Sequence, residues 1–301
     1  MVEIKNLTFS YKRKQNTLKD LSMLIPAGSI FAFVGENGAG KSTTLKHIVG
    51  LIPERSGTIE VFGKSLRTHR KEIMQKVGVM IESPSFYPYL SGYDNLKIHC
   101  LYRKLSFERI EEVTRLVGLN DQLHKKYKAY SMGMKQQLGL ALTLLADPDL
   151  IVLDEPMNGL DPTRRIAFRN ILLDLNRKGK TVLLSSHHLP EVELIATDIG
   201  IIKEGTILFQ GSMESLRRLK QKHQSLHIEV SDVEHTIRLL ENEFEILLKN
   251  SKSGKLEIGI KDRENIPLIV QRLTTKGIAI YKLNGNEKSL EELFIDSISA
   301  K

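Results

Sequence analysis

The sequence predicts an α/β fold with a mainly parallel sheet, followed by a small α+β domain of ferredoxin-like type. Uninterrupted apolar runs at Ser29–Val34, Leu150–Leu153 and Thr181–Ser185 indicate strands that are buried on both faces. Helix-forming stretches separate these runs, and this alternation is typical of a parallel sheet with helices on both faces. The pattern then changes, so we expect a first domain over 1–220 and an accessory domain over 221–301.

Local patterns assign the remaining elements of the first domain. Short apolar segments predict strands at Val2–Ile4, Leu7–Tyr11, Leu21–Leu24, Ser56–Val61 and Val77–Ile81. Apolar residues at three- and four-residue steps, such as Ile110, Val113 and Leu116, predict helices between 94 and 128, within a helical subdomain over about 90–146. A helix is expected at Ala167–Lys178. The domain should close with a hairpin whose two strands are Ile199–Ile202 and Ile207–Phe209.

The accessory domain alternates short strands with helices. The expected strands are Ser225–Val230, Glu245–Leu248, Leu256–Ile260 and Ile278–Leu283, and the expected helices are Asp232–Asn242, Glu264–Lys276 and Ser289–Ile298. This βαββαβα order is that of a ferredoxin-like domain. Ser231 with Glu234, and Ser289 with Glu292, have the spacing of helix capping boxes. The region shows no catalytic pattern, and we interpret it as a packing or regulatory module.

Composition narrows the class of protein. The 301 residues are 41% hydrophobic and 27% charged, as in globular proteins. No apolar run reaches the length of a membrane-spanning helix, and the first residues lack the apolar core of a signal peptide. Cys100 is the single cysteine, which excludes an internal disulfide framework. A cytoplasmic protein is therefore expected.

The net charge of +8 raises the question of an anionic partner. The positive residues are spread along the chain, with local clusters at 12–14 and 217–222. A solvated surface is the favoured interpretation, followed by attraction to an anionic membrane surface and then by nucleic-acid binding. We expect no nucleic-acid partner.

A glycine-rich loop lies between a predicted buried strand and a predicted helix. Residues 35–42 read GENGAGKS and fit the phosphate-binding pattern G-x-x-x-x-G-K-[ST]. Glycines let successive N–H groups converge on phosphate oxygens, and the helix that follows adds its unpaired N–H groups. We expect Lys41 to contact the β- and γ-phosphates and Ser42 to bind Mg²⁺. The candidate nucleotide-binding residues in this segment are Gly35, Asn37, Gly38, Gly40, Lys41, Ser42 and Thr43.

Two acidic residues follow the apolar run at Leu150–Leu153. They should emerge at the carboxyl end of a buried strand, where ligands bind in open α/β sheets. Because side chains alternate along a strand, the two neighbours can take different roles. Asp154 is expected to hold Mg²⁺, through water, and Glu155 to act as the general base that polarises the attacking water.

Several motifs occur in the order found in ABC transporter ATPases, and the chain resembles this family over roughly residues 1–220. After the glycine loop come Asp154-Glu155, a D-loop that contains Asp161, and a switch segment that ends at His187. Tyr11 lies where the family places an aromatic ring that stacks on adenine. The resemblance implies a P-loop ABC cassette that uses ATP and Mg²⁺. It also implies that His187, rather than His188, hydrogen-bonds the γ-phosphate and keeps Glu155 and its water in register.

The segment YSMGMKQQ at 130–137 is a variant of the family's LSGGQ signature. Ser131 is expected to cap the helix that follows, which leaves helix N–H groups for an anion. The resemblance implies that Ser131 and Gly133 meet the γ-phosphate held by a second cassette, so that a two-fold dimer encloses two ATP molecules. Met132 replaces a glycine and Met134 replaces the glutamine of the signature.

Glu82 stands where the family usually has glutamine. An ionised carboxylate offers only hydrogen-bond acceptors and adds charge. Beside Glu155 this charge is expected to disfavour ionisation of one of the two carboxylates. The hypothesis is that Glu82 binds Mg²⁺ and helps relay the nucleotide state to a permease; the alternative is a loop substitution without effect on mechanism.

Glu82, the variant signature and the stretch ESPSFYPYLSGYDNL at 82–96 resemble one branch of the family, the bacitracin-resistance and lantibiotic-immunity ATPases. The accessory domain is similar to theirs as well. The resemblance implies an ATPase subunit, paired with an identical or related cassette, that drives a separate membrane permease from the cytoplasmic face and expels a peptide antibiotic.

Two other functions are compatible with part of the pattern. One is an ABC ATPase without a permease that acts on ribosomes or DNA; such relatives usually carry two cassettes or a long coiled-coil insertion, and neither is present. The other is a cassette that has lost catalysis and only gates or scaffolds. The presence of Lys41, Asp154, Glu155 and His187 argues against this second interpretation.

Overall fold

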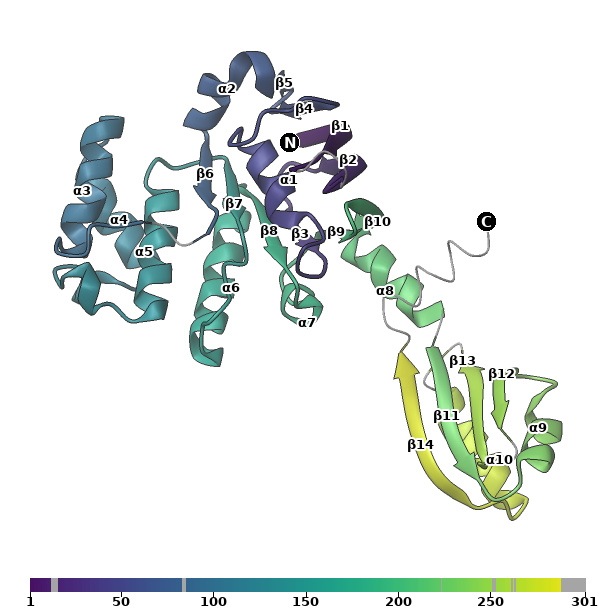
Figure 1. Ribbon diagram of the computed structural model, residues 1–301. Helices are drawn as coiled ribbons and strands as arrows, with labels where there is room; N and C mark the ends of the chain where they lie inside the picture. Colours follow the sequence, from purple (N-terminus) through teal and green to yellow (C-terminus); the bar gives the residue numbers. More distant parts are fainter. Residues whose placement is uncertain are drawn as a thin grey trace. The chain divides into compact units, whose positions relative to one another are not determined.

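A computed structural model describes residues 1–11, 16–82, 85–222, 224–250, 253–260, 262 and 264–287. The chain forms two compact units, Met1–Met213 and Glu214–Lys301 (Figure 1). The domain boundary predicted after residue 220 falls within helix α8 (Met213–Lys222) and stays a prediction. In the described ranges, no helix combines the length and the apolar character needed to cross a membrane.

The first unit is built around a six-stranded sheet in the order β10-β9-β3-β8-β7-β6 (Figure 1). Its strands are β3 (Ile30–Val34), β6 (Val77–Met80), β7 (Leu150–Leu153), β8 (Thr181–Ser186), β9 (Asp198–Lys203) and β10 (Thr206–Ser212). All neighbouring pairs are parallel except β9 and β10. β3, β7 and β8 are buried along their whole length, as their apolar runs predicted. The expected mainly parallel α/β fold is confirmed.

A second sheet is antiparallel, in the order β2-β1-β4-β5. Its strands are β1 (Val2–Phe9), β2 (Leu18–Ile25), β4 (Thr58–Val61) and β5 (Lys64–Ser65). The prediction of two separate strands before residue 12 is wrong, because β1 is continuous. Asn6 has a φ of 53°, and the register with β2 shifts between Ile4 and Leu7. This bulge breaks the side-chain alternation without ending the strand.

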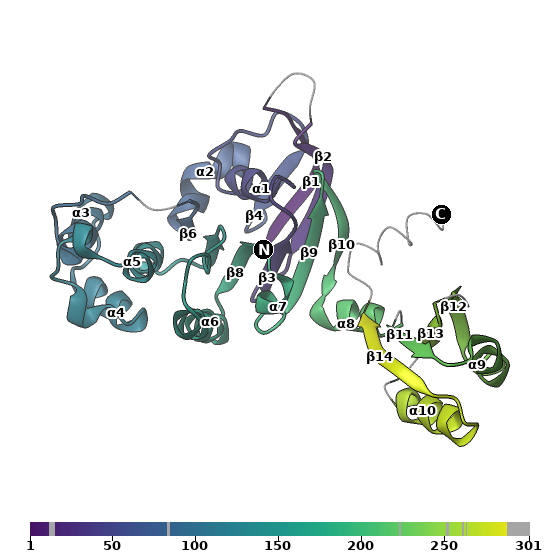
Figure 2. The ribbon, with the colours of Figure 1, turned by 60° about the horizontal axis from the view of Figure 1, so that its bottom comes forward.

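Helices pack around and beside the sheets (Figure 2). Those of the sheet region are α1 (Lys41–Ile48), α2 (Leu66–Gln75), α6 (Pro162–Arg177) and α7 (Leu189–Val192). One core cluster joins both sheets to α1, and it includes Phe31 and Phe33 of β3 and Leu45 of α1. Because α1 begins directly after the glycine loop, this packing fixes the loop against the sheet.

Three further helices lie together beside the β6 edge of the sheet in both views: α3 (Gly92–Arg103), α4 (Glu108–Leu116) and α5 (Met132–Leu144) (Figures 1 and 2). The helical pattern expected between 94 and 128 is interrupted. Lys104, with a φ of 57°, caps the end of α3, and Gly118, with a φ of 69°, follows α4. Two short 3-10 turns, Asn120–Gln122 and Tyr127–Ala129, complete the segment.

His47 is a polar member of the main core. Its side chain on α1 is fully buried, and its ring meets the edge of Phe9 with centroids 4.8 Å apart. Within the described ranges, no partner meets hydrogen-bond geometry with either ring nitrogen. Burial lowers the pKa of His47 from its usual 6.5, and the backbone of Ile52 offsets part of this effect. The folded protein therefore favours the neutral imidazole.

We expect His47 to make folding sensitive to mild acid. Because its pKa is lower in the folded state, the unfolded chain binds a proton that the folded chain refuses, and stability falls as the pH drops below 6.5. The contribution of this group reaches at most about 1.4 kcal/mol per pH unit. Urea unfolding between about pH 7.5 and pH 5.5 should show a shallower pH dependence for His47→Leu than for wild type. Equal slopes would contradict this expectation.

The second unit contains a four-stranded antiparallel sheet in the order β12-β13-β11-β14. Its elements are β11 (Gln224–Val230), α9 (Val233–Leu240), β12 (Glu245–Asn250), β13 (Lys255–Ile260), α10 (Asn265–Thr275) and β14 (Ile280–Glu287). Apolar residues of both helices join those of the strands in one core cluster. This βαββαβ order with antiparallel pairing confirms the ferredoxin-like type.

Two details of this unit bear on the capping predictions. The cap predicted at Ser231 is wrong: Asp232 is the N-cap of α9 and accepts a hydrogen bond from the backbone N–H of His235 at 2.9 Å. Ser231 Oγ instead accepts from the backbone N–H of Ala279 at 3.0 Å. The predicted last helix, with its capping pair Ser289 and Glu292, lies outside the described residues.

Candidate functional site

Three adjacent strands bring the predicted residues to one edge of the six-stranded sheet. β3, β8 and β7 are neighbours and run parallel. The glycine loop follows β3, Asp154 and Glu155 follow β7, and His187 follows β8. The carboxyl ends of parallel strands meet at one edge, where open α/β sheets bind ligands. The topology therefore gathers residues that are far apart in the sequence.

The glycine loop has the backbone of a phosphate cradle. Gly38 and Gly40 have φ values of 85° and 111°, which side chains disfavour. Gly40, which has no side chain, is the N-cap of α1, so the cap residue offers no side-chain acceptor to the first N–H groups of the helix. Asn37 is exposed in the loop, and Ser42 and Thr43 lie in the first turn of α1. These features fit an anion at the loop.

Lys41 is held at the centre of the site. Its side chain is only 6% exposed, and Nζ donates to the carbonyl oxygens of Gly35 at 2.7 Å and Glu36 at 3.1 Å. The same Nζ lies 3.3 Å from Oε1 of Glu155. The loop lysine and the acid after β7 thus form an ion pair across the site.

The second carboxylate oxygen of Glu155, Oε2, has a partner that orients the side chain. Oε2 lies 2.9 Å from Nδ1 of His187, and within the described part of the chain the ring of His188 forms no hydrogen bond or ion pair with it. Oε1 is buried and accepts no hydrogen bond from the described residues. This buried carboxylate oxygen faces the Lys41 ammonium at 3.3 Å but has no donor with hydrogen-bond geometry among the described residues, so it is a suitable acceptor for a water proton. Glu155 also has a left-handed backbone, with a φ of 47°.

Ser185 links the two acids, and sequence reasoning did not assign it a role. Its hydroxyl donates to Oδ1 of Asp154 at 2.5 Å and accepts from the backbone N–H of Glu155 at 2.8 Å. The parallel register pairs Leu153 with Leu184, which brings the next residue of each strand side by side. This pairing was the available signal, but it requires knowing that β7 and β8 are neighbours.

The donor set suits Mg²⁺ bound together with a phosphate substrate. Asp154 offers a carboxylate and Ser42 a hydroxyl near the loop. The described residues hold no group of three or more His, Cys, Asp or Glu side chains able to bind a metal. Mg²⁺ usually binds one or two carboxylates and completes its shell with phosphates and water. The residues present therefore fit this ion without a dedicated protein cage.

Tyr11 lies beside the first turn of α1. Its hydroxyl is 3.5 Å from Oγ1 of Thr43, and its ring meets Phe9 edge-on with centroids 4.8 Å apart. The residue is 61% exposed. An exposed aromatic ring next to the phosphate loop offers a surface on which a base can stack.

Glu82 has a partner that sequence reasoning missed. Its Oε1 accepts from Nζ of Lys46 at 2.7 Å, and this hydrogen bond lowers the pKa of Glu82. The expectation that the charge of Glu155 would oppose ionisation is therefore wrong for Glu82, because Lys46 of α1 stabilises its charged form. Glu82 is exposed and has a left-handed φ of 62°.

The signature segment begins α5. Ser131 is the N-cap, and its Oγ accepts from the backbone N–H of Met134 at 3.3 Å, as expected from the sequence. Met132, which replaces a glycine, is 61% exposed. Gln136 donates from Nε2 to the carbonyl oxygen of Pro156 at 2.7 Å. This bond ties α5 to the segment that carries Glu155.

Ser131, Gly133 and Asp161 lie apart from the phosphate loop of their own chain. In the described ranges no hydrogen bond or ion pair joins any of them to residues 35–43. Asp161 is the N-cap of α6, and its Oδ1 accepts from the backbone N–H of Arg164 at 3.0 Å. The structure of one chain thus brings Lys41, Asp154, Glu155 and His187 together and leaves the signature and the D-loop outside the cluster.

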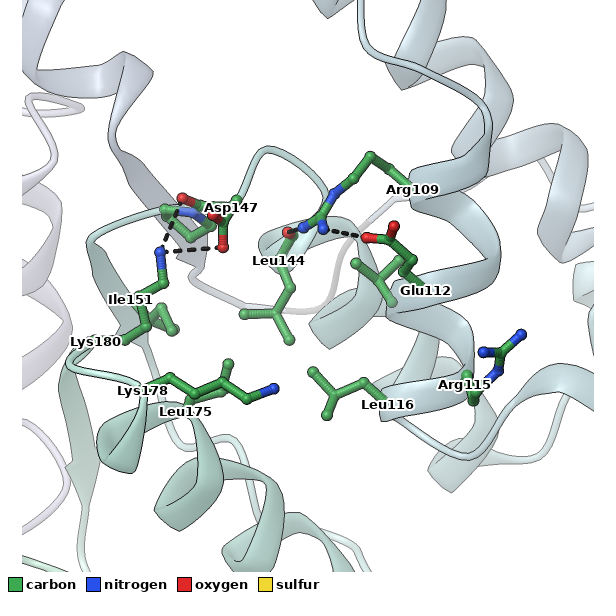
Figure 3. Close-up of a pocket in the computed structure, with 12 residues that line it drawn as sticks. Arg109, Glu112, Arg115, Leu116, Leu144, Asp147, Ile151, Leu175, Lys178 and Lys180 are labelled. Carbon is green, nitrogen blue, oxygen red and sulfur yellow. Dashed lines mark hydrogen bonds and ion pairs between the residues drawn. The ribbon is translucent and has the colours of Figure 1, made fainter.

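A cavity of about 420 Å³ lies elsewhere, lined by α4 and by the ends of α5 and α6 (Figure 3). It includes Ile151, near the amino end of β7, whereas the candidate site lies at the carboxyl end. Arg109 donates to the carbonyl oxygen of Leu144 and pairs with Glu112, and Lys180 pairs with Asp147. These bonds connect the helices with the sheet region, so the residues around the cavity have a structural role.

Comparison with known proteins decides the family. A family model for ABC transporters matches residues 18–158, and a model for the C-terminal domain of DrrA1-3-like ATP-binding proteins matches residues 211–298. The chain is 34% identical to the bacitracin transport ATP-binding protein BcrA of Bacillus licheniformis, over 99% of this chain and 97% of that protein. The chain belongs to the ATP-binding ATPase subunits of ABC transporters.

Two further likenesses concern the cassette of this ABC subunit. It is 39% identical to the lantibiotic transport ATP-binding protein SrtF of Streptococcus pyogenes, over 73% of this chain and 95% of that protein. A solved ATP-binding subunit of an ABC transporter is 31% identical and superposes with a TM-score of 0.65, over 72% of this chain and 92% of that chain. The expected ABC cassette and ATPase function are confirmed, and the roles of individual residues stay predictions.

Proposed function

We propose that this ABC subunit hydrolyses Mg·ATP at an interface between two cassettes and so drives a separate membrane permease. The observation that carries the proposal is the network of Lys41, Glu155 and His187 at the carboxyl ends of three adjacent strands. In addition, among the residues that the structure describes, no hydrogen bond or ion pair joins the signature or the D-loop to the glycine loop of the same chain. A second cassette, identical or related, would bring them to the nucleotide.

The chemistry follows from positions and charges. The N–H groups of the loop and Lys41 bind the phosphates, and the exposed ring of Tyr11 stacks on the base. Ser42 and Asp154, with Glu82 as a further ligand, would hold Mg²⁺, which would supply positive charge that neutralises the phosphate oxygens. Oε1 of Glu155 accepts a proton from the attacking water. With both ring nitrogens protonated, His187 holds the carboxylate in place through Nδ1 and donates from Nε2 toward the γ-phosphate.

Binding and hydrolysis would move the cassettes relative to each other. Two ATP molecules held between two chains favour the closed pair by their greater affinity for it. Hydrolysis removes the γ-phosphate that both chains contact, and the pair opens. We place the subunit at the cytoplasmic face of the cell membrane, attached through the permease. The segment around Glu82 would relay the motion.

The proposed cargo is a peptide antibiotic of the bacitracin type. BcrA matches this chain over 99% of its length, whereas SrtF matches 73%, an extent near that of the cassette alone. The accessory domain, which the shorter match leaves largely uncovered, therefore favours the bacitracin-type relatives over the lantibiotic type. Substrate contacts themselves lie in the permease.

The test is made in the native cell with the chain and its permease intact. Deleting the gene should raise sensitivity to bacitracin, and wild type, but not Lys41→Met, should restore resistance. A lantibiotic of the nisin type serves as the second arm, and sensitivity to it alone would shift the cargo to that class. If the purified protein bound no permease and its ATPase activity instead rose with RNA or DNA, the transport proposal would be wrong.

The role of Glu82 is tested by Glu82→Gln. We expect a several-fold rise in the Mg²⁺ concentration needed for half-maximal ATPase activity, because a charged ligand is lost. The free energy of unfolding should stay close to that of wild type, since exposed ion pairs contribute little to stability. Glu72→Gln is the matched control, because Glu72 forms a similarly exposed pair with Lys64. An unchanged Mg²⁺ requirement would contradict the proposed role.

A further inference from the structure

An arginine outside the signature covers the first turn of α5. Arg164 lies on α6, three residues after its N-cap Asp161. Its Nη1 donates to Oγ of Ser131 at 3.1 Å, and its Nε lies 3.4 Å from Oδ2 of Asp161. The side chain of Arg164 is 41% exposed, so a molecule that approaches Ser131 also meets the guanidinium.

Gly133 shows how close this approach is. A Cβ at Gly133 would lie 2.1 Å from Nη1 of Arg164 and 2.6 Å from its Cδ. Gly133 is buried although Ser131 and Met132, just before it, are exposed. The side chain of Arg164 therefore shields Gly133 from solvent. The absence of a side chain at Gly133 makes room for the guanidinium.

The hydroxyl of Ser131 can make one further hydrogen bond, as a donor. Its oxygen accepts from the backbone N–H of Met134 and from Arg164, which occupies both of its lone pairs. Among the residues that the structure describes, none accepts a hydrogen bond from this hydroxyl, so its proton is available as a donor. The natural partner of such a proton is a group that only accepts hydrogen bonds, such as a phosphate oxygen.

The charge of Arg164 favours the same partner. Asp161 is the one carboxylate paired with it among the described residues, and the separation of 3.4 Å leaves other guanidinium N–H groups unused. The first turn of α5 beside it carries partial positive charge. A phosphate between Ser131 and Arg164 would accept hydrogen bonds from both. Its negative charge would also offset the repulsion between the guanidinium and the positive first turn of α5.

We propose that Arg164 binds the γ-phosphate of the nucleotide held by the second cassette, together with Ser131. The inference rests on the proposed function, since it requires that the signature helix meets ATP across a dimer. Arg164 thereby adds a charged donor to the neutral donors of the signature. In this chain, which lacks the glutamine of the signature, Arg164 supplies the charge-assisted contact at this helix.

The experiment measures ATP-dependent dimerisation in full-length Glu155→Gln protein, by sedimentation at a series of protein concentrations. Adding Arg164→Ala should weaken the ATP-bound dimer by about a hundredfold to ten-thousandfold, because each of its two composite sites loses a hydrogen bond to a charged group worth about tenfold to a hundredfold. Arg164→Lys should fall between the two. Binding of a fluorescent ATP analogue to the monomer should stay within about twofold of the parent, because the residue acts on the other chain's nucleotide.

Arg177→Ala is the matched control. Arg177 lies on the same helix and pairs with Asp174 three residues before it, as Arg164 does with Asp161. It should leave dimerisation unchanged. Thermal unfolding of both variants tests whether Arg164→Ala acts through stability, and a loss of dimerisation explained by unfolding would overturn the inference.

The outcomes separate this inference from the proposed function. If Ser131→Ala weakens the dimer and Arg164→Ala leaves it unchanged or tightens it, Arg164 is a bystander or an obstruction and the inference alone fails. A loss of nucleotide binding by the Arg164→Ala monomer would also overturn it. If Glu155→Gln protein with Arg164 intact does not dimerise in ATP, the composite site itself is wrong and both fail.

Discussion

A Glu155→Gln variant is expected to bind ATP with near wild-type affinity and to hydrolyse it at least about a hundredfold more slowly. Oε1 of Glu155 is the buried acceptor beside Lys41, and an amide cannot take a proton from water there. The loss falls on kcat, because binding depends on the loop and Lys41 rather than on this carboxylate. ATPase kinetics together with nucleotide titration check the prediction.

Glu112→Gln provides the comparison for that experiment. Glu112 is an exposed glutamate on α4 that pairs with Arg109, and its loss should leave kcat unchanged. ATP-dependent dimers should also accumulate in Glu155→Gln protein, since the γ-phosphate is no longer removed. Turnover at the wild-type rate would show that another group activates the water.

Replacing Lys41 with methionine is expected to have the second large effect, on both binding and stability. Lys41 is buried and supplies the positive charge that faces Glu155. Its removal takes the opposite charge away from Oε1 of Glu155 and the donor away from the carbonyl oxygens of Gly35 and Glu36, which is expected to cost about 3 kcal/mol. Loss of the charged contact should also weaken ATP binding by about tenfold to a hundredfold. Urea unfolding and nucleotide titration measure the two effects.

The double variant Lys41→Met/Glu155→Gln separates these effects. It removes both charges, so its free energy of unfolding should recover most of the loss while ATP binding stays weak. Lys178→Met, at an exposed lysine after α6, should change neither quantity. A single Lys41→Met variant as stable as wild type would show that the ion pair does not form in solution.

Much of the site could be predicted because it depends on local order in the sequence. The apolar runs before the glycine loop, before Asp154 and before His187 each end where a polar group begins. Parallel strands of one sheet must then present these groups at a common edge. The fold class followed from the same runs, since strands buried on both faces require cover by helices.

The missed features depend on which elements are neighbours. Ser185 contacts Asp154 only because β8 lies beside β7, and Lys46 contacts Glu82 only because α1 lies near the end of β6. Local competition also misled the prediction at Ser231, where the adjacent Asp232 caps the helix. Ser and Asp are nearly equal as N-caps, so the pattern alone does not choose between them.

Two acids at the ends of neighbouring strands, Glu82 after β6 and Glu155 after β7, share a backbone that glycine adopts at no cost. An ordinary side chain in this region costs about 1–2 kcal/mol. A protein selected only for the stability of its folded state would carry glycine or asparagine at both positions. The strained backbone therefore lies at two acids that we propose act on the nucleotide, and a search for heat-resistant variants should find stabilising substitutions at these positions that lower turnover.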